Sequence, residues 1–299
     1  MRKFRKALLI YNELAGQKNA ARNLGEYTTL LTQSVEELLV RKTTKKGDAK
    51  ELSFEYSSIV DIIFVLGGDG TLHEVINGIG DIVKRPIIAP LPGGTCNDMT
   101  RSLNIPQEIH RACEALSTGK VIHVDGVKMN NQYFINFLGV GLIVEASKNR
   151  SSTEKSLLGS ISYYVSALKS IGNSETFSYS MTLDQEKRTG DAVMILVTNG
   201  HYIGTNNIPI QESSLNDGVG EVYVIKKTDF ATLMEVIKIV ASKKNHLNYN
   251  PNVLTCYKAS HIVIETDKPM PLDMDGEVSS STPANIQFLQ DHFQFLVPS

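Results

Sequence analysis

The sequence predicts an α/β N-terminal domain with a parallel sheet, followed by a second, mainly antiparallel β domain. Three observations support this prediction. Before Val121, short apolar blocks rich in β-branched residues alternate with helical patterns, as in a parallel sheet covered on both faces. Two of these blocks lead directly into glycine-rich turns. Beyond Val121, most segments have the pattern of strands and are separated by turn residues.

The amino-acid composition limits the classes of protein to which the chain can belong. The chain has 299 residues, enough for two domains, and its 41% hydrophobic and 21% charged residues are typical of soluble globular proteins. A formal net charge of −2 provides no attraction to nucleic acid. Three widely spaced cysteines, Cys96, Cys113 and Cys256, favour a reducing compartment and form no zinc-binding pattern. No stretch approaches the roughly 18 apolar residues of a membrane-spanning helix, so we expect a cytoplasmic protein with peripheral membrane contact only.

The first elements follow from apolar blocks and helical spacing. An apolar run predicts a strand over residues 6–11, and spaced leucine and valine residues predict a helix over 20–40. Residues 42–50 form a polar, basic break. A β-branched run predicts the next strand over 59–66, and a helix is expected from Thr71.

Two further elements complete the first domain. Residues 86–90 form a short apolar block and predict a strand that opens into a turn at 92–98. Helical spacing predicts a helix over 109–116, followed by the glycine that commonly ends a helix. We place the boundary near Val121, with a first domain over residues 1–121 and a second over 122–299, whose final residues can pack back on the first.

The most informative segment is the run Gly67, Gly68, Asp69, Gly70 and Thr71, which joins a predicted strand to a predicted helix. Such a turn presents backbone N–H groups to a phosphate, and glycine lets a ligand approach the main chain closely. The run matches neither the usual dinucleotide fingerprint nor a Walker motif. Its aspartate would repel phosphate unless a metal, ribose or amide groups lay between them. The alternative is an ordinary tight turn between strand and helix.

A second turn, at residues 92–98, combines two glycines with hydroxyl, amide and carboxylate side chains. The alternative here is a helix cap at Asn97 or Asp98, and capping and ligand binding can coincide at one helix start. Because ligands bind beyond the carboxyl ends of parallel strands, both glycine turns are expected to face one crevice.

The second domain is predicted to be mainly antiparallel. Turn residues such as Asn130-Asn131 separate the expected strands, which cover residues 121–128, 132–136, 176–183, 192–198, 219–225, 261–266 and 293–297. Two helical patterns, at 157–171 and 230–242, carry apolar stripes. Such a stripe either lies on a membrane surface or covers a sheet.

Together these motifs resemble the diacylglycerol kinase catalytic family, in particular the small bacterial lipid kinases related to sphingosine kinases. The matching motifs follow the family's order along nearly the whole chain: Gly67-Gly-Asp-Gly-Thr71 with Glu74 and Asn77, the turn ending at Asp98, Asp125-Gly126, residues 133–136 with 139–141, residues 215–218, and Asp275-Gly-Glu277. The first motif alone is shared with NAD kinases, and the ordered set is far more specific. The chain departs from the family at 12–16, where the usual proline is absent.

The resemblance implies an NAD-kinase-like nucleotide domain, a C-terminal β-sandwich domain that carries the lipid site and the catalytic aspartate, and an active site in the interdomain cleft. ATP would lie on the two glycine turns. The positions that match nucleotide contacts are Asn12, Gly67, Gly68, Asp69, Gly70, Thr71, Glu74, Gly94, Thr95 and Asn97.

The resemblance also implies catalytic acids and Mg²⁺. Asp69, Asp98 and Asp125 match positions that help to organise the catalytic Mg²⁺ through water, which fits an ion that keeps several waters. Asp275 matches the proposed general base, with Glu277 beside it.

Two Asp-Gly pairs also allow a simpler interpretation. Asp-Gly is a favoured hairpin pair, so the pattern alone favours a turn at Asp275-Gly276, and the resemblance reverses that preference. Asp273 lies in the same segment, and only one of the two carboxylates is expected to face the cleft. At Asp217-Gly218 a turn and a metal site are compatible. The resemblance assigns a structural Mg²⁺ to Asp217, helped by the backbone carbonyls of Ser214 and Val219.

We therefore expect an ATP- and Mg²⁺-dependent lipid kinase that phosphorylates the hydroxyl of diacylglycerol or a related lipid, giving a phospholipid such as phosphatidic acid. The alternatives are an NAD kinase and a non-catalytic nucleotide-binding regulator of the same fold. Retention of the four aspartates Asp69, Asp98, Asp125 and Asp275 argues against the regulator. The expected partners are ATP and a lipid at a membrane surface, and because family members often dimerise, a homodimer is compatible with the sequence.

Overall fold

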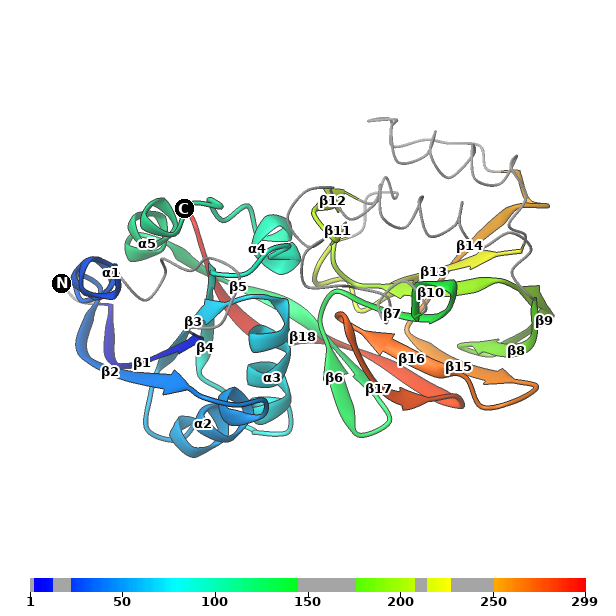
Figure 1. The fold of residues 1–299 in the computed structure, drawn as a ribbon, viewed down its shortest axis with the longest axis horizontal. Coiled ribbons are helices and arrows are strands. Elements are labelled where there is room, and N and C mark those ends of the chain that lie inside the picture. The colour runs from blue at the N-terminus through cyan, green and yellow to red at the C-terminus, as the bar shows by residue number, and fades with distance from the viewer. Residues whose placement is uncertain (1–2, 13–22, 145–175, 208–213, 227–249) are drawn as a thin grey trace. The chain divides into compact units, whose positions relative to one another are not determined.

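The computed structural model describes residues 3–12, 23–144, 176–207, 214–226 and 250–299 (Figure 1). The chain forms two compact units, one of Met1–Gly126 with Asp291–Ser299 and one of Val127–Gln290. It therefore passes from one unit to the other twice. The helical patterns predicted at 157–171 and 230–242, which carry the candidate membrane-binding stripes, lie outside the described residues.

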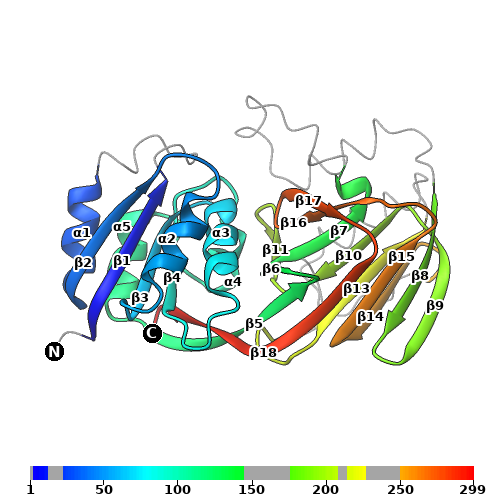
Figure 2. The ribbon, with the colours of Figure 1, turned by 90° about the horizontal axis from the view of Figure 1, so that it is seen from below.

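The first unit is a parallel sheet with helices on both faces. Its sheet has the strand order β2-β1-β3-β4, and Phe295 of β18 pairs in parallel with Ile88 of β4. Helices α1 and α5 contact each other on one face, and α2 and α3 on the other (Figures 1 and 2). The elements are β1 (Phe4–Asn12), α1 (Leu24–Leu31), β2 (Val35–Thr43), α2 (Asp48–Tyr56), β3 (Ile62–Gly67), α3 (Asp69–Ile79), β4 (Ile87–Pro92), α4 (Asp98–Ser102), α5 (Ile109–Ser117), β5 (Lys120–Met129) and the end of β18 (Ala284–Val297).

Burial explains why these segments form these elements. Residues 7–10 of β1 and 62–66 of β3 are at most 1% exposed, as expected for central parallel strands covered on both faces. Helices α3 and α5 bury one face each, with the spacing i, i+3, i+4, i+7. The predicted parallel α/β domain is confirmed.

The helix predicted over residues 20–40 is confirmed over 24–31 and wrong from Val35 onward, and its first residues, 20–22, lie outside the described residues. Residues 24–31 form α1, but Val35–Thr43 forms β2, which pairs in parallel with β1 along its whole length. The leucine and valine spacing fits either element, and pairing with the edge of β1 decides in favour of the strand. The polar break predicted at 42–50 contains the end of β2 and the start of α2.

The second unit is an antiparallel sandwich, as predicted. One sheet has the order β14-β13-β10-β7-β16-β17, and the strands β18, β15, β8 and β9 are paired in that order in the other. The strands are β6 (Gln132–Phe134), β7 (Phe137–Gly141), β8 (Phe177–Leu183), β9 (Glu186–Ala192), β10 (Met194–Thr198), β11 (Tyr202–Ile203), β12 (Asn206–Asn207), β13 (Gly220–Ile225), β14 (Leu254–Ala259), β15 (His261–Thr266), β16 (Pro271–Met274), β17 (Glu277–Ser281) and the first part of β18.

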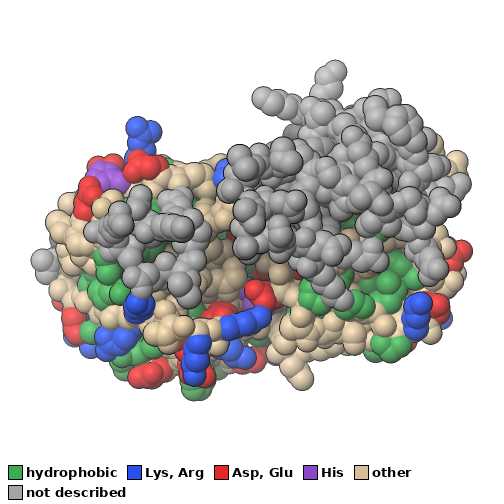
Figure 3. All heavy atoms as spheres, in the orientation of Figure 1, with side chains coloured by type: hydrophobic (Ala, Val, Ile, Leu, Met, Phe, Trp, Pro, Cys, Tyr) green, Lys and Arg blue, Asp and Glu red, His purple; other side chains and the backbone are tan. Residues whose placement is uncertain are grey.

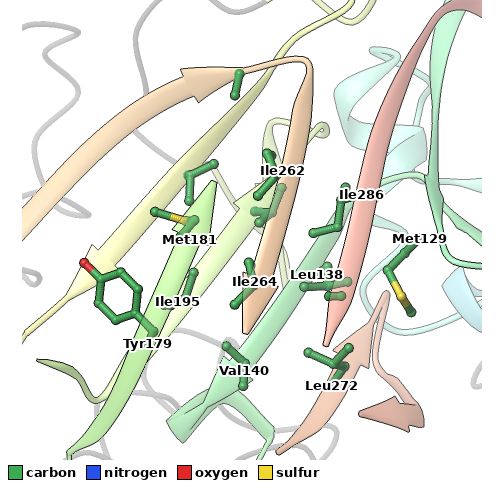
Figure 4. Close-up of a cluster of buried hydrophobic side chains, with 14 of the residues drawn as sticks. Met129, Leu138, Val140, Tyr179, Met181, Ile195, Ile262, Ile264, Leu272 and Ile286 are labelled. Atoms are coloured by element: carbon green, nitrogen blue, oxygen red, sulfur yellow. The ribbon is translucent and has the colours of Figure 1, made fainter. Parts of the chain in front are cut away.

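The sandwich core is formed by both sheets. Leu138, Val140 and Ile195 from one sheet lie in the same buried cluster as Ile262 and Ile264 from the other (Figure 4). Neighbouring residues along β10 belong to a second buried cluster on the opposite face of its sheet. Burial on both faces explains the continuous apolar run from Met194 to Val197 in β10.

Two surface observations bear on membrane contact. Among the described helices, none is long and apolar enough to cross a bilayer. On the visible face in Figure 3, acidic and basic side chains of the described residues are intermingled, which agrees with the formal net charge of −2.

Candidate active site

The first group of candidate residues lies at the carboxyl edge of the parallel sheet in the first unit. Asn12 ends β1 and Gly67 ends β3, while Pro92, the last residue of β4, is the register partner of Gly67. The two predicted glycine turns therefore start side by side, at the edge where parallel α/β sheets bind ligands.

The two glycine turns are in direct contact. Gly93 N donates to Gly67 O at 2.9 Å. A Cβ on Gly94 would lie 2.4 Å from the Cα of Gly68, so no other residue fits at position 94 while the turns stay in this arrangement. This close approach leaves main-chain groups of both turns at one edge.

The side chain of Asp69 connects the turns. Its Oδ2 accepts a hydrogen bond from Asn97 N at 2.8 Å, and its Oδ1 accepts one from Asp98 N at 2.7 Å. Asn97 has a φ of 54° and its Oδ1 accepts from Gly94 N at 2.8 Å, which closes the second turn. The charge of Asp69 is thus directed at main-chain donors at the start of α4, which such a carboxylate stabilises.

The remaining nucleotide candidates are divided between two locations. Asn12 Nδ2 donates to Thr71 Oγ1 at 3.5 Å, which brings the end of β1 to the first turn, and Thr95 is exposed on the second turn. The carboxylate of Glu74 instead accepts from Gly47 N at 2.9 Å and Ala49 N at 3.1 Å. Its observed contacts therefore hold the start of α2.

Two further predicted acids of the first unit are buried. Asp98 is the first residue of α4 and is 5% exposed, and Asp125 on β5 is fully buried. Asp125 Oδ1 accepts from Asp291 N at 2.9 Å, so this carboxylate binds the backbone where β18 enters the first unit. The main chain of Asp98 is hydrogen-bonded to Asp69, whereas the carboxylate of Asp125 is hydrogen-bonded to the backbone of β18.

The candidate base, Asp275, belongs to the second unit and is held by three main-chain donors. Its Oδ1 accepts from Asn136 N at 2.9 Å and Phe137 N at 3.1 Å, and its Oδ2 accepts from Ile135 N at 3.0 Å. Asp275 has a φ of 53° and is 6% exposed. Asp tolerates this left-handed backbone, which occurs in tight turns and at functional sites. The predicted hairpin turn and a fixed carboxylate therefore coincide.

The neighbouring acids have different surroundings. Asp273 is fully buried, and its Oδ1 accepts from Gly276 N at 2.8 Å, which supports the turn that carries Asp275. Glu277 begins β17 and is half-buried. Both aspartates of this segment are thus buried, and Asp273 has a structural contact within the turn.

The predicted structural metal site lies in an exposed turn before β13. Asp217 accepts from Ser214 N at 3.4 Å and from Val219 N at 3.3 Å. Among the described residues, no three His, Cys, Asp or Glu side chains gather as a metal-binding set. An ion at Asp217 would therefore need backbone carbonyls and water in addition to this carboxylate, a donor set that suits Mg²⁺.

Sequence reasoning gave no role to Asn199 and Gly200, which follow β10. Asn199 Nδ2 donates to Ile135 O at 2.9 Å, and both Asn199 N and Gly200 N donate to Asn136 O. They support the segment that binds Asp275. The available signal was an amide and a glycine directly after a buried strand, the pattern that marked the other turns.

Comparison with known proteins assigns both parts of the chain. Residues 6–129 match the diacylglycerol kinase catalytic domain, and residues 138–297 match the YegS C-terminal NAD kinase beta sandwich-like domain. The fold and these two family matches together identify a kinase that consists of an α/β unit and an NAD-kinase-like sandwich unit. The chain belongs to the diacylglycerol kinase catalytic family, and the family implies that it binds ATP.

Relatives match over nearly the full length. The chain is 36% identical to "Putative lipid kinase SH2167" of Staphylococcus haemolyticus, over 98% of this chain and 96% of that protein. It is 34% identical to "Putative lipid kinase SaurJH9_0749" of Staphylococcus aureus, over 98% and 97%. The crystal structure of a putative diacylglycerol kinase from Bacillus anthracis superposes with a TM-score of 0.89 at 37% identity, covering 99% of this chain and 98% of that one.

Proposed function

We propose that the chain transfers the γ-phosphoryl group of ATP to the hydroxyl of diacylglycerol, giving phosphatidic acid and ADP. The lipid oxygen bonds to the γ-phosphorus, the bond to ADP breaks, and the hydroxyl proton passes to Asp275. The observation that carries this proposal is the buried carboxylate of Asp275, held by three main-chain donors. A carboxylate that is already held in place in the free protein needs little reorganisation to act as a general base.

The first unit would bind the nucleotide. Its two glycine turns offer main-chain N–H groups and a threonine hydroxyl on each turn, Thr71 and Thr95. Asp69 would act on the nucleotide by keeping the two turns together, because both of its oxygens accept main-chain hydrogen bonds. Transfer then requires bound ATP and the hydroxyl beside Asp275 to meet during turnover.

Asp98 and Asp125 are the carboxylates that we propose for the catalytic Mg²⁺, and Asp217 for a structural ion. Both Asp98 and Asp125 are buried, and a buried carboxylate requires a cation or hydrogen-bond donors around it. When bound, the catalytic ion would neutralise charge on the transferred phosphoryl group.

The test is a substrate panel. Purified full-length protein is incubated with radiolabelled ATP, MgCl₂ and, in separate reactions, diacylglycerol, ceramide, sphingosine or undecaprenol in mixed micelles, or NAD. We expect label in phosphatidic acid and its loss when EDTA is present. Label only in NAD phosphate would identify an NAD kinase, and no transfer to any acceptor would support the non-catalytic regulator.

A second prediction tests nucleotide placement without turnover. Burial raises the pKa of the Cys113 thiol to about 12 and that of the Cys256 thiol to about 11, so both stay protonated and slow to react at pH 8. Cys96 lies half-exposed in the second glycine turn. We expect iodoacetamide to modify Cys96 first, and saturating MgATP to slow that modification, as measured by mass spectrometry. Unchanged labelling with MgATP would contradict nucleotide binding at this turn, and Cys96→Ser provides the blank.

A further inference from the structure

The segment that holds Asp275 lies outside the regular pairing of the sheets. Ile135 and Asn136 form the bend between β6 and β7, two strands that belong to different sheets. Among the strand pairs of the described residues, none includes either residue. Their main-chain N–H groups instead donate to Asp275, at 3.0 Å from Ile135 N and 2.9 Å from Asn136 N. Contacts other than a sheet ladder must therefore fix the orientation of these peptide groups.

Asn199, which directly follows β10, provides such contacts. Its Nδ2 donates to Ile135 O at 2.9 Å, and its main-chain N donates to Asn136 O at 2.8 Å. Gly200 N donates to the same Asn136 oxygen at 3.0 Å. Asn199 is buried, and β10 lies inside its sheet, between β13 and β7. The donors that hold the bend therefore extend from a rigid strand, which suits a group that must orient a functional side chain.

Planar peptide groups connect Asn199 to Asp275. In a trans peptide the C=O and the N–H point in opposite directions and rotate together. The 135–136 peptide accepts from Asn199 Nδ2 at its oxygen and donates to Asp275 Oδ1 from its nitrogen. The 136–137 peptide accepts from Asn199 N and donates to the same oxygen of Asp275. A rotation that turns either carbonyl away from Asn199 therefore also turns an N–H away from Asp275.

We propose that Asn199 is a positioning residue for the reaction. Through the bend, its side-chain amide keeps the carboxylate of Asp275 in the orientation that accepts the proton of the lipid hydroxyl. The inference rests on the proposed lipid-kinase function, in which Asp275 is the general base. Asn199 acts through the peptide groups of the bend rather than on the substrate. Its loss should therefore displace the base without removing it, and a displacement of about 1 Å costs up to about 10²-fold in rate.

The first test is Asn199→Ala, which removes the Nδ2 donor and keeps the main-chain donors to Asn136 O. We expect kcat for lipid phosphorylation to fall by about tenfold to hundredfold. The KM for ATP should stay the same, since the nucleotide candidates belong to the first unit. An asparagine that served stability alone would leave kcat per folded molecule unchanged, and that result would overturn the inference. The matched control is Asn285→Ala, on an exposed asparagine of the same unit, which should leave kcat unchanged.

A double-mutant cycle with Asp275→Asn shows whether Asn199 acts through the base. If its effect passes through Asp275, Asn199→Ala should change kcat by less than about twofold once the base is absent, so the two losses are not additive. A residue that contributed to the reaction by another route would lower kcat by the same factor in both backgrounds. Equal factors, measured with radiolabelled ATP, would overturn the inference.

Amide hydrogen exchange gives a readout that does not depend on activity. The N–H groups of residues 135–137 donate to Asp275 and should exchange slowly in the wild type. Asn199→Ala is expected to speed their exchange by about tenfold and to leave residues 262–264 of β15 unchanged, as measured by mass spectrometry of peptic peptides.

Two exchange results would contradict the proposed role of Asn199. Unchanged exchange at residues 135–137 would overturn the inference, and so would equal acceleration at 262–264, which would indicate a general loss of stability. A wild-type chain that phosphorylates no acceptor would refute the proposed function instead. The exchange rates would still decide whether Asn199 fixes the peptide groups that bind Asp275.

Discussion

Asp275→Asn is expected to reduce kcat for lipid phosphorylation by about 10²- to 10⁴-fold, the usual contribution of a general base. An amide cannot take the hydroxyl proton. Binding of ATP should be unchanged, because the nucleotide candidates belong to the first unit and Asp275 to the second. The measurement is steady-state kinetics with saturating lipid, together with ATP titration by calorimetry.

The same substitution should also affect the fold locally. The two oxygens of Asp275 accept from three N–H groups, whereas asparagine has one acceptor oxygen and an NH₂ group. Ile135 N would face a donor, and an unpaired buried N–H costs about 1–3 kcal/mol. We therefore expect a lower melting temperature, and kinetics must be measured well below it.

The matched control for Asp275→Asn is Asp267→Asn, the same chemical change on an exposed residue of the same unit. It should leave both kcat and stability within experimental error. Near-normal kcat in Asp275→Asn would remove this residue as the base.

Gly94→Ala is expected to lower kcat/KM for ATP by about 10²-fold, the typical cost of moving a binding group by about 1 Å. The added Cβ would lie 2.4 Å from Gly68 Cα and 3.2 Å from Gly68 N. Both are backbone atoms, so relief requires the two glycine turns to separate. That separation would also strain the hydrogen bonds from Asn97 N and Asp98 N to Asp69. Nucleotide titration and initial rates measure the effect.

Gly25→Ala is the control for this steric argument. It is also a glycine to alanine change in the first unit, but an added Cβ on Gly25 meets nothing within 4 Å. Within α1 it should raise helix stability by up to about 1 kcal/mol and leave ATP kinetics unchanged. Equal kinetics for Gly94→Ala and wild type would show that the contact between the turns is not needed for nucleotide use.

Elements with a distinct local sequence pattern were predicted correctly, whereas elements that depend on distant residues were not. The strands over 6–11 and 59–66 and the helix over 109–116 are found close to their predicted positions, because central parallel strands and amphipathic helices have distinct local patterns. Strand β2 was predicted as helix because its placement depends on the edge of β1. The start of α2 was missed because Glu74, 27 residues beyond Gly47, caps it.

In the candidate site, too, local features could be predicted from the sequence and long-range contacts could not. The glycine turns were found from sequence because glycine, aspartate and asparagine at a strand end are a local signal. The observed contacts of Asp69 and Glu74 with main-chain N–H groups could not be predicted, since each joins segments distant in sequence. The binding of Asp275 by residues 135–137 spans about 140 positions and leaves no short-range pattern.

The sequence by itself determined the α/β class of the first unit, its central strands, the positions of the glycine turns and the identity of the acidic residues, because each of these follows from side-chain types at short spacing. Only the tertiary structure decided which of these acids hold main-chain donors, that Gly94 lies against Gly68, and that Asn199 supports the segment that binds Asp275. The physical reason is that hydrogen bonds and close contacts depend on distances of a few ångströms between residues far apart in the chain.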